Sequence, residues 1–538
     1  MEQKLSIFRK QGEQIMVNVQ IYDTTLRDGS QGEGVSFSVE DKLRIAQELD
    51  KLGIDYIEGG YAGANPKDEE FFKRAKELKL KKAKLAAFGS TKRIGNKASE
   101  DKNLNQLIQA DTSVITIVGK SWELHVRDVL RTSLDENLEL IEDSVRFLVD
   151  NDREVIFDAE HFFDGYKSNP EYAISTLKSA ENGGASCLVL CDTNGGTMPL
   201  EIAEIIMAIE KSVKIPIGIH AHDDSGLAVA NSIIAIQTGA RQVHGTFNGY
   251  GERCGNANLC TIIPNLKLKL GINCMSDEGI ANLTTASRLV SELANMPHDE
   301  KLPYVGRSAF AHKAGLHADA VQKNPVTYEH IDPEIVGNER RFLVSEQAGK
   351  SSILAKLWRD HPNLQKNSPE VQLISNNLKE FEKEGYQYEG AEASFELMVN
   401  RTIGKHKNSF ELKGFTVLVE RSEKHEMRSQ ATIKLMDVNG NIEYQASEGH
   451  GPVDALNKAL MKALITFFPE LESVRLTDFK VRVLNAKSGT AAKVRVLIES
   501  SDGNMNWGTV GVSEDIIEAS WEALVDSIEY KLYKNSQK

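Results

Sequence analysis

The sequence predicts an α/β protein that begins with a closed (β/α)8 TIM barrel, followed by helical linker subdomains and a duplicated ββα-type α+β domain. Three observations support this fold class. Eight short apolar runs recur about thirty residues apart, helical patterns lie between them, and a strand–turn–strand–helix pattern occurs twice near the end. A chain of 538 residues is too long to fold around a single hydrophobic core, so more than one domain is expected. We expect domains at 17–275, 276–395 and 396–536.

The apolar runs are typical of buried parallel strands, and the segments between them are typical of amphipathic helices. In residues 38–53, for example, Ser38 can cap a helix and Asp41 lies three positions later, as in a capping box. An open doubly wound sheet is the structural alternative, but a count of eight favours closure. The eight runs are residues 17–24, 54–60, 83–89, 113–119, 154–160, 186–193, 216–222 and 242–251.

Residues 276–395 are charged and lack the alternation of strands, and residues 277–297 and 344–361 have helical patterns. Beyond them, residues 431–460 align by pattern with residues 492–524. Each unit places an Asn-Gly or Asp-Gly pair, a strong hairpin signal, between two strands and then continues into a helix. The duplicated domain is either a dimerisation module or an effector-binding module.

Composition excludes several classes of protein. The net charge of −14 disfavours nucleic acid and anionic membranes as partners. No run of 18 uncharged apolar residues exists, and the first twenty residues lack the apolar segment of a signal peptide. The five cysteines form no C-x-x-C pair, so we expect a reduced, cytoplasmic protein.

Polar residues gather at the ends of the predicted strands, where TIM barrels carry their active sites. The segment HAHDD (220–224) is the most informative, because His220 and His222 project to the same side of a strand and can bind one cation. Two hydrogen-bonded structural histidines are the alternative. Barrel closure brings strands 1, 7 and 8 together, so we expect Asp28 and Asn256 to complete the ligand set. Zn, Mn, Fe or Co suit these donors, and Mg suits them with added waters.

Three further residues at the same end of the barrel predict chemistry at a carbonyl group. Arg27 places a fixed positive charge beside the cation, where it can stabilise an oxygen that gains charge. Glu160 can take a proton from an acidic C–H bond or orient the substrate, unless it only forms a salt bridge. Thr193 can donate a hydrogen bond to a substrate carboxylate, unless it caps the backbone. Together these residues indicate carbon–carbon bond making or breaking next to a carbonyl.

A segment beyond the barrel, residues 309–330, carries His312, His317, Tyr328 and His330. It is either a polar loop or a functional segment that reaches a neighbouring subunit's barrel and supplies a proton-transfer group. Three histidines and a tyrosine within 22 residues favour the functional interpretation.

These segments resemble the signatures of the 2-isopropylmalate, homocitrate and citramalate synthases over nearly the whole chain. LRDGSQ, with Lys42 after it, resembles the first signature, and HAHDDSG resembles the second. Three further segments resemble parts of these synthases. They are NGYGERCGNA (248–257), HKAGLHADA with the later TYE, and EGHGPVDAL (448–456), the last of which resembles part of the regulatory domain.

The resemblance implies a metal-dependent acyltransferase that condenses acetyl-CoA with a small 2-oxo acid in a Claisen-type reaction. It assigns His317 and Tyr328 to the partner subunit's active site in a homodimer. It also implies that the C-terminal domain binds an end-product amino acid, isoleucine in the first instance. Residues 23–38 and 57–72 look most like citramalate synthases, which use pyruvate. The alternatives are a sister synthase for a bulkier 2-oxo acid, a lyase, and a sensor without catalysis.

Overall fold

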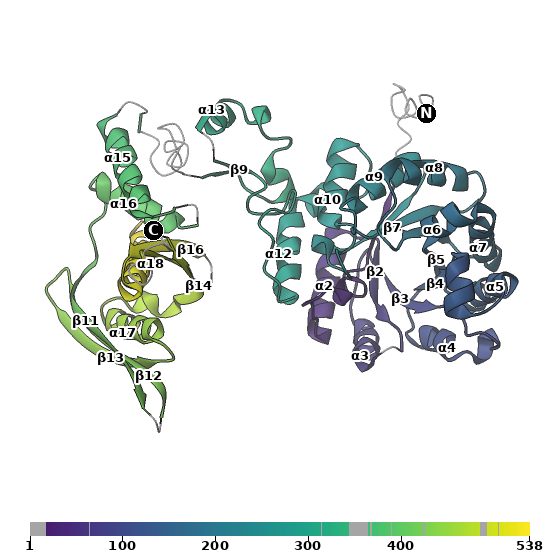
Figure 1. Cartoon of the computed structure of the whole chain (residues 1–538), viewed down its shortest axis with the longest axis horizontal. Helices are drawn as coiled ribbons and strands as arrows, with labels where there is room; N and C mark the ends of the chain where they lie inside the picture. Colours follow the sequence, from purple (N-terminus) through teal and green to yellow (C-terminus); the bar gives the residue numbers. More distant parts are fainter. Residues whose placement is uncertain are drawn as a thin grey trace. The chain divides into compact units, whose positions relative to one another are not determined.

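The protein is described from a computed structural model (Figure 1). It describes residues 18–63, 65–313, 315–343, 364–365, 368–388, 390–422, 425–484, 492–503 and 505–537. The chain forms two compact units. The first extends to Phe310 and includes Ile331–Glu339, and the second comprises Ala311–His330 and the chain from Arg340 onward.

The first unit contains a closed barrel of eight parallel strands in the order β1 to β8, as the sequence predicts. Strand β8 pairs with β1, from Gln242 opposite Gln20 to Gly245 opposite Asp23, and this pairing closes the barrel. The strands are β1 (Gln20–Asp23), β2 (Tyr56–Tyr61), β3 (Lys84–Ser90), β4 (Val114–Lys120), β5 (Glu154–Glu160), β6 (Cys187–Asp192), β7 (Ile217–Ala221) and β8 (Gln242–Gly245).

Helices follow the strands and surround the barrel, and the main core lies between the two layers. The predicted capping box of α2 is confirmed: Ser38 accepts from the Asp41 backbone N–H, and the Asp41 carboxylate accepts from the Ser38 N–H. The helices are α2 (Val39–Leu52), α3 (Pro66–Ala75), α4 (Lys102–Gln109), α5 (Leu134–Asp150), α6 (Phe162–Ser168), α7 (Pro170–Gly183), α8 (Pro199–Ile209), α9 (Ala228–Thr238) and α10 (Leu259–Pro264).

The chain after the barrel is helical, as its composition indicates. Helices α11 (Asp277–Ala281) and α12 (Leu283–Leu293) belong to the first unit and cover most of the helix predicted over 277–297. The predicted helix over 344–361 lies outside the described residues. The second unit begins with β9 (Ala311–His312), α13 (Gly315–Lys323) and β10 (Arg341–Phe342), followed by α15 (Pro369–Glu384) and α16 (Glu392–Thr402).

The C-terminal repeat is present with one more strand in each unit than the sequence predicts. Asn439–Gly440 and Asp502–Gly503 form the expected turns, and both glycines adopt positive φ values, 84° and 85°. The extra strand β14 is mostly exposed, and its apolar alternation at Phe479, Val481 and Val483 was not used in the sequence interpretation. The units are β11 (Phe410–Ser422), β12 (His425–Asp437), β13 (Ile442–Gly449) and α17 (Pro452–Phe467), then β14 (Arg475–Val483), β15 (Val494–Ser501), β16 (Asn506–Ser513) and α18 (Ile516–Ser536).

None of the helices in the described part of the chain combines the length and apolarity needed to cross a lipid bilayer.

A buried carboxyl group at the end of β1 makes stability depend on pH. Burial raises the pKa of Asp23 to about 7, although Thr25 donates two hydrogen bonds to it. In the unfolded chain the pKa is about 3.9, so only the folded state holds this proton between those values. The contribution of Asp23 to the free energy of unfolding is therefore greatest below pH 4 and falls as pH rises through 7.

We expect Asp23→Asn to remove this dependence. At pH 8 the variant should be more stable than the parent by about 1–3 kcal/mol, because no buried carboxylate then has to ionise. Urea unfolding of both metal-free proteins at pH 5 and pH 8 measures the difference. Equal pH slopes for the two proteins would contradict a raised pKa at Asp23.

Candidate active site

Four predicted ligands meet at the carboxyl ends of β1, β7 and β8. The Asp28 Oδ2 atom lies 3.1 Å from His220 Nε2 and 3.9 Å from His222 Nε2. The Asn256 Nδ2 atom lies 3.0 Å from both Asp28 Oδ2 and His220 Nε2. All four side chains are buried. The structure thus brings together the residues that barrel closure predicts.

Local turns place these side chains. After β1 the chain turns sharply, and the Thr24 carbonyl accepts hydrogen bonds from the N–H groups of residues 27, 28 and 29. After β8, Gly255 has a φ of +97°, which favours glycine, and a Cβ there would lie 2.1 Å from the Gly249 carbonyl oxygen. A Cβ on Gly251 would lie 1.9 Å from Asn256 Oδ1. The glycines of this segment therefore allow Asn256 to approach Asp28.

The chemistry of these residues fits a divalent cation. One ligand atom from each of Asp28, His220 and His222 lies within 4.8 Å of the others. The Asn256 Oδ1 atom is buried and has no hydrogen-bond partner among the described residues, so an amide oxygen is available as well. Nitrogen and oxygen donors in this mixture suit Zn, Mn, Fe or Co, and Mg when water completes the shell.

The protonation states of Asp28 and His222 also suit a cation. Burial opposes the charge on Asp28, but Arg27 and His220 hold the pKa of this carboxyl well below its usual range. Burial and the charge of His220 lower the pKa of His222 to about 4, so its imidazole is neutral at pH 7. Burial also opposes the charged form of His220, but the hydrogen bond to Asp28 raises its pKa above the ordinary value.

Arg27 is fixed beside the cluster by a buried carboxylate. The Glu58 Oε2 atom accepts from Arg27 Nε at 2.6 Å and from Thr24 Oγ1 at 2.5 Å, and Oε1 accepts from the Tyr22 hydroxyl at 2.7 Å. The guanidinium carbon lies 3.8 Å from the centre of the Phe88 ring, and Nη1 lies 3.5 Å from Asp28 Oδ2. Glu58 lies on β2, and its role as the anchor of Arg27 was not predicted from the sequence.

Glu160 and Thr193 lie at the same end of the barrel and already have protein partners. Glu160, at the end of β5, forms a close ion pair with Lys120 at the end of β4. The Thr193 hydroxyl, just after β6, accepts a hydrogen bond from the His161 N–H at 2.9 Å. The sequence had left these structural roles open as alternatives, a salt bridge for Glu160 and a hydrogen bond to the backbone for Thr193. A hydroxyl that accepts one bond can still donate its hydrogen to a ligand.

In the second unit, His317 and Tyr328 are exposed and stack with their ring centres 4.1 Å apart. His312 of the same segment is different. It is buried, and its Nε2 atom lies 2.9 Å from Glu329 Oε1, which also binds Arg340. Two of the predicted residues are therefore adjacent and accessible within this unit, whereas His312 takes part in its internal packing.

A second layer of residues inside the barrel was given no role from the sequence, although Asp158 was noted at the end of the fifth strand. Asp158, two residues before Glu160, lies 3.8 Å from His220 Nδ1 and 3.9 Å from His244 Nδ1. His244 stacks on Tyr22 at 3.8 Å. Burial raises the pKa of Asp158 to about 7 and keeps His244 neutral by lowering its pKa well below the usual value. The role of Asp158 could have been sought from the alternation of side chains along β5, because residues two positions apart, such as Asp158 and Glu160, face the same side of a strand.

Comparison with known proteins identifies the family. The HMGL-like family model matches residues 18–290, the homocitrate synthase post-HMGL domain-like model matches 304–385, and the LeuA allosteric (dimerisation) domain model matches 389–532. The chain is 55% identical to (R)-citramalate synthase of Geobacter sulfurreducens and 56% identical to (R)-citramalate synthase of Aquifex aeolicus. Each alignment covers 96% of this chain and 98% of the relative. The chain belongs to the (R)-citramalate synthase family.

Relatives at 31% identity include both citramalate and 2-isopropylmalate synthases. The 2-isopropylmalate synthase of Methanocaldococcus jannaschii is 31% identical over 96% of both chains. The (R)-citramalate synthase family thus shares its barrel and both later segments with sister synthases. The barrel of this member, an HMGL-like domain, holds the Asp28 cluster, and its C-terminal repeat forms the LeuA-type domain.

Proposed function

We propose that the protein is an (R)-citramalate synthase, an acyltransferase that condenses acetyl-CoA with pyruvate and releases CoA. The observation that carries the proposal is the identity of 55–56% to (R)-citramalate synthases over nearly the full chain. The buried cluster of Asp28, His220 and His222 beside the anchored Arg27 supports it, because the reaction needs a polarised carbonyl.

The residues of the barrel have distinct roles in this proposal. Asp28, His220, His222 and Asn256 would hold a divalent cation, which when bound draws electron density from the ketone of pyruvate. The Arg27 guanidinium stabilises the ketone oxygen as it gains negative charge, and its fixed position means that little reorganisation is needed. Thr193 donates a hydrogen bond to the carboxylate of pyruvate.

Proton transfer requires a base and an acid. Glu160 removes a methyl proton from acetyl-CoA or positions the base, and the resulting carbanion attacks C2 of pyruvate to form the new C–C bond. His317 and Tyr328 of the partner subunit are the rival proton-transfer groups, and their stacked, exposed rings support this role. Hydrolysis of the thioester by water then releases CoA and drives the condensation.

The test is thiol release from acetyl-CoA with pyruvate, 2-oxobutanoate, 2-oxoisovalerate or 2-oxoglutarate, with and without a chelator. Chelator-sensitive release with pyruvate as the preferred acid supports the proposal. Strong release with 2-oxoisovalerate or 2-oxoglutarate would make the protein a 2-isopropylmalate or homocitrate synthase, which is the alternative that the relative at 31% identity keeps open. Release with none of the four acids would contradict both.

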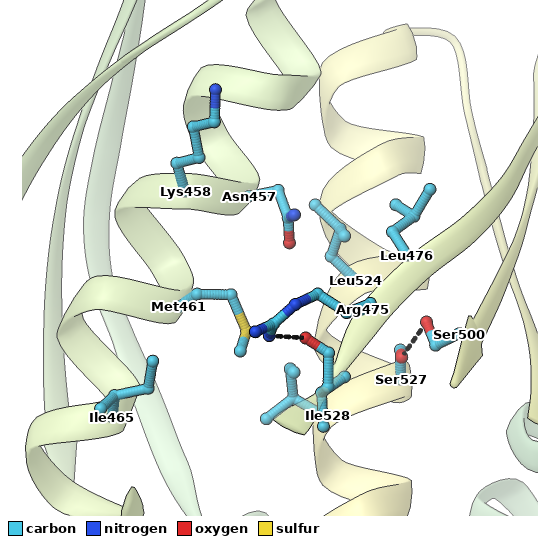
Figure 2. Close-up of a pocket in the computed structure, with 11 residues that line it drawn as sticks. Asn457, Lys458, Met461, Ile465, Arg475, Leu476, Ser500, Leu524, Ser527 and Ile528 are labelled. Carbon is cyan, nitrogen blue, oxygen red and sulfur yellow. Dashed lines mark hydrogen bonds between the residues drawn. The ribbon is translucent and has the colours of Figure 1, made fainter. Parts of the chain in front are cut away.

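We also propose that the C-terminal domain binds an amino-acid effector, isoleucine in the first instance. A cavity of about 200 Å³ lies between α17 and α18, bordered by β14 and β15 (Figure 2). Its apolar lining suits an aliphatic side chain, and Arg475 supplies positive charge for a carboxylate, whereas Lys458 is ion-paired with Asp454. The apolar residues are Met461, Ile465, Val474, Leu476, Leu524 and Ile528.

Filling this cavity should abolish feedback without affecting catalysis. We expect Met461→Trp to raise the isoleucine concentration for half-inhibition by at least about tenfold, because the larger side chain occupies the ligand's volume. The matched control is Met427→Trp on β12, where the side chain is exposed. Inhibition curves at saturating pyruvate measure both. An unchanged curve for Met461→Trp would place the effector elsewhere.

We further propose that the enzyme is a cytoplasmic homodimer that serves the pyruvate route to isoleucine. All five cysteines are free thiols, as a reducing compartment maintains. The match to the LeuA allosteric (dimerisation) domain supports the dimer. Light scattering of the full chain tests the dimer, and a monomer that retains full activity would contradict both it and the exchange of His317 and Tyr328.

A further inference from the structure

Three buried polar atoms below the proposed cation site face one another without hydrogen-bond partners among the described residues. They are Asp158 Oδ1 on β5, His220 Nδ1 on β7 and His244 Nδ1 on β8. All three side chains are at least 95% buried. Because buried polar atoms in folded proteins are nearly always paired, a cluster of three indicates a function for the group.

The two nitrogens of His220 face different groups. Nε2 lies 3.1 Å from Asp28 Oδ2, on the side of the proposed cation, whereas Nδ1 lies 3.8 Å from Asp158 Oδ2. A neutral imidazole has one lone pair, so His220 can bind a cation through Nε2 only when Nδ1 carries the hydrogen. Among the described residues, the only carboxylate within 4 Å of Nδ1 is that of Asp158.

We infer that Asp158 is a positioning residue that accepts the His220 Nδ1–H and thereby directs the Nε2 lone pair at the cation. The inference rests on the proposed metal function. His244 Nδ1 lies 3.9 Å from the other oxygen of Asp158, and the His244 ring is fixed by the hydrogen bond between its Nε2 atom and Gln242 Oε1 and by its stack on Tyr22. Carboxylates in this position orient metal-binding histidines and strengthen metal affinity in many proteins.

A second cation held by Asp158, His220 and His244 is the competing assignment, since their ligand atoms also lie within 4.8 Å of one another. It would require lone pairs on both nitrogens of His220 when the first site is also filled. A neutral imidazole cannot supply both. The positioning role uses the same atoms without this conflict.

The experiment is a titration of the metal-free full-length protein with Co²⁺ in competition with a coloured chelator. We expect Asp158→Asn to weaken Co²⁺ binding by about 10- to 100-fold and to alter the absorption bands of bound Co²⁺. Activity should recover in part at high metal concentration. The matched control is Asp23→Asn, which removes an equally buried carboxylate from β1 that binds Thr25 instead. We expect its Co²⁺ affinity to stay within about twofold of the parent.

Each other outcome is informative. Parent-like affinity and bands for Asp158→Asn would overturn the inference, and so would a fall from two bound Co²⁺ to one, which would make Asp158 a ligand. If Asp158→Asn does not fold, Asp158→Ser removes the same carboxylate with a smaller side chain, and an unchanged affinity there would overturn the inference. Failure of the parent to bind Co²⁺ would instead overturn the proposed metal function itself.

Discussion

Replacing Asp28 with alanine should reduce kcat/KM for citramalate formation by about 1,000-fold or more, equivalent to ~4 kcal/mol of transition-state stabilisation. The reason is its central position: His220, His222, Asn256 and Arg27 all approach the same Oδ2 atom. Without this carboxylate the ligand set keeps two imidazoles and one amide, and Arg27 loses one of its two acidic neighbours. Thiol release from acetyl-CoA with pyruvate and metal content after dialysis measure the two effects.

The fold should survive this change. The turn that carries Asp28 is held by backbone hydrogen bonds to the Thr24 carbonyl, and Arg27 keeps its bond to Glu58. Asp28→Asn is the isosteric companion, which retains the packing and removes the charge. A loss of secondary structure in both variants would show that Asp28 is structural, whereas normal turnover by either would show that catalysis does not depend on its charge.

The barrel and the ligand cluster were predictable because both depend on pattern rather than on detail. Eight apolar runs require eight buried strands, and closure necessarily brings the first strand beside the eighth. Once His220 and His222 are placed on strand 7, Asp28 and Asn256 follow from the order of strands. No side-chain conformation has to be known for this step, and the four side chains do lie together.

The partners of these residues could not be predicted in the same way. The bond between Arg27 and Glu58 depends on the register between β1 and β2, and the ion pair of Glu160 with Lys120 on that between β4 and β5. Both also depend on side-chain rotamers. The pairing of β2 with β3 also shifts register between Glu58 and Gly60, which no alternation of apolar residues reveals. The contact of Asp158 with His220 crosses the barrel interior from β5 to β7, so it depends on the shape of the closed barrel.

Replacing Arg27 with glutamine should lower kcat by about 100- to 1,000-fold while Co²⁺ affinity changes by only a few fold. Arg27 is not a proposed ligand, so its loss leaves the donors in place but removes the positive charge beside the developing oxyanion. It also leaves Glu58 buried with two hydroxyl donors and no cation. We therefore expect the free energy of unfolding to fall by about 3–5 kcal/mol at pH 7.

These two effects of Arg27→Gln can be separated with a second substitution. In the double variant Arg27→Gln, Glu58→Gln no buried charge remains unpaired, so stability should return toward that of the parent while kcat stays low. Arg241→Gln is the control for loss of an arginine near the barrel, because Arg241 binds the backbone carbonyls of Gly239 and Ala240 at the opposite end of β8. Recovery of kcat in the double variant would mean that Arg27 acts only by neutralising Glu58 and has no direct part in stabilising the oxyanion.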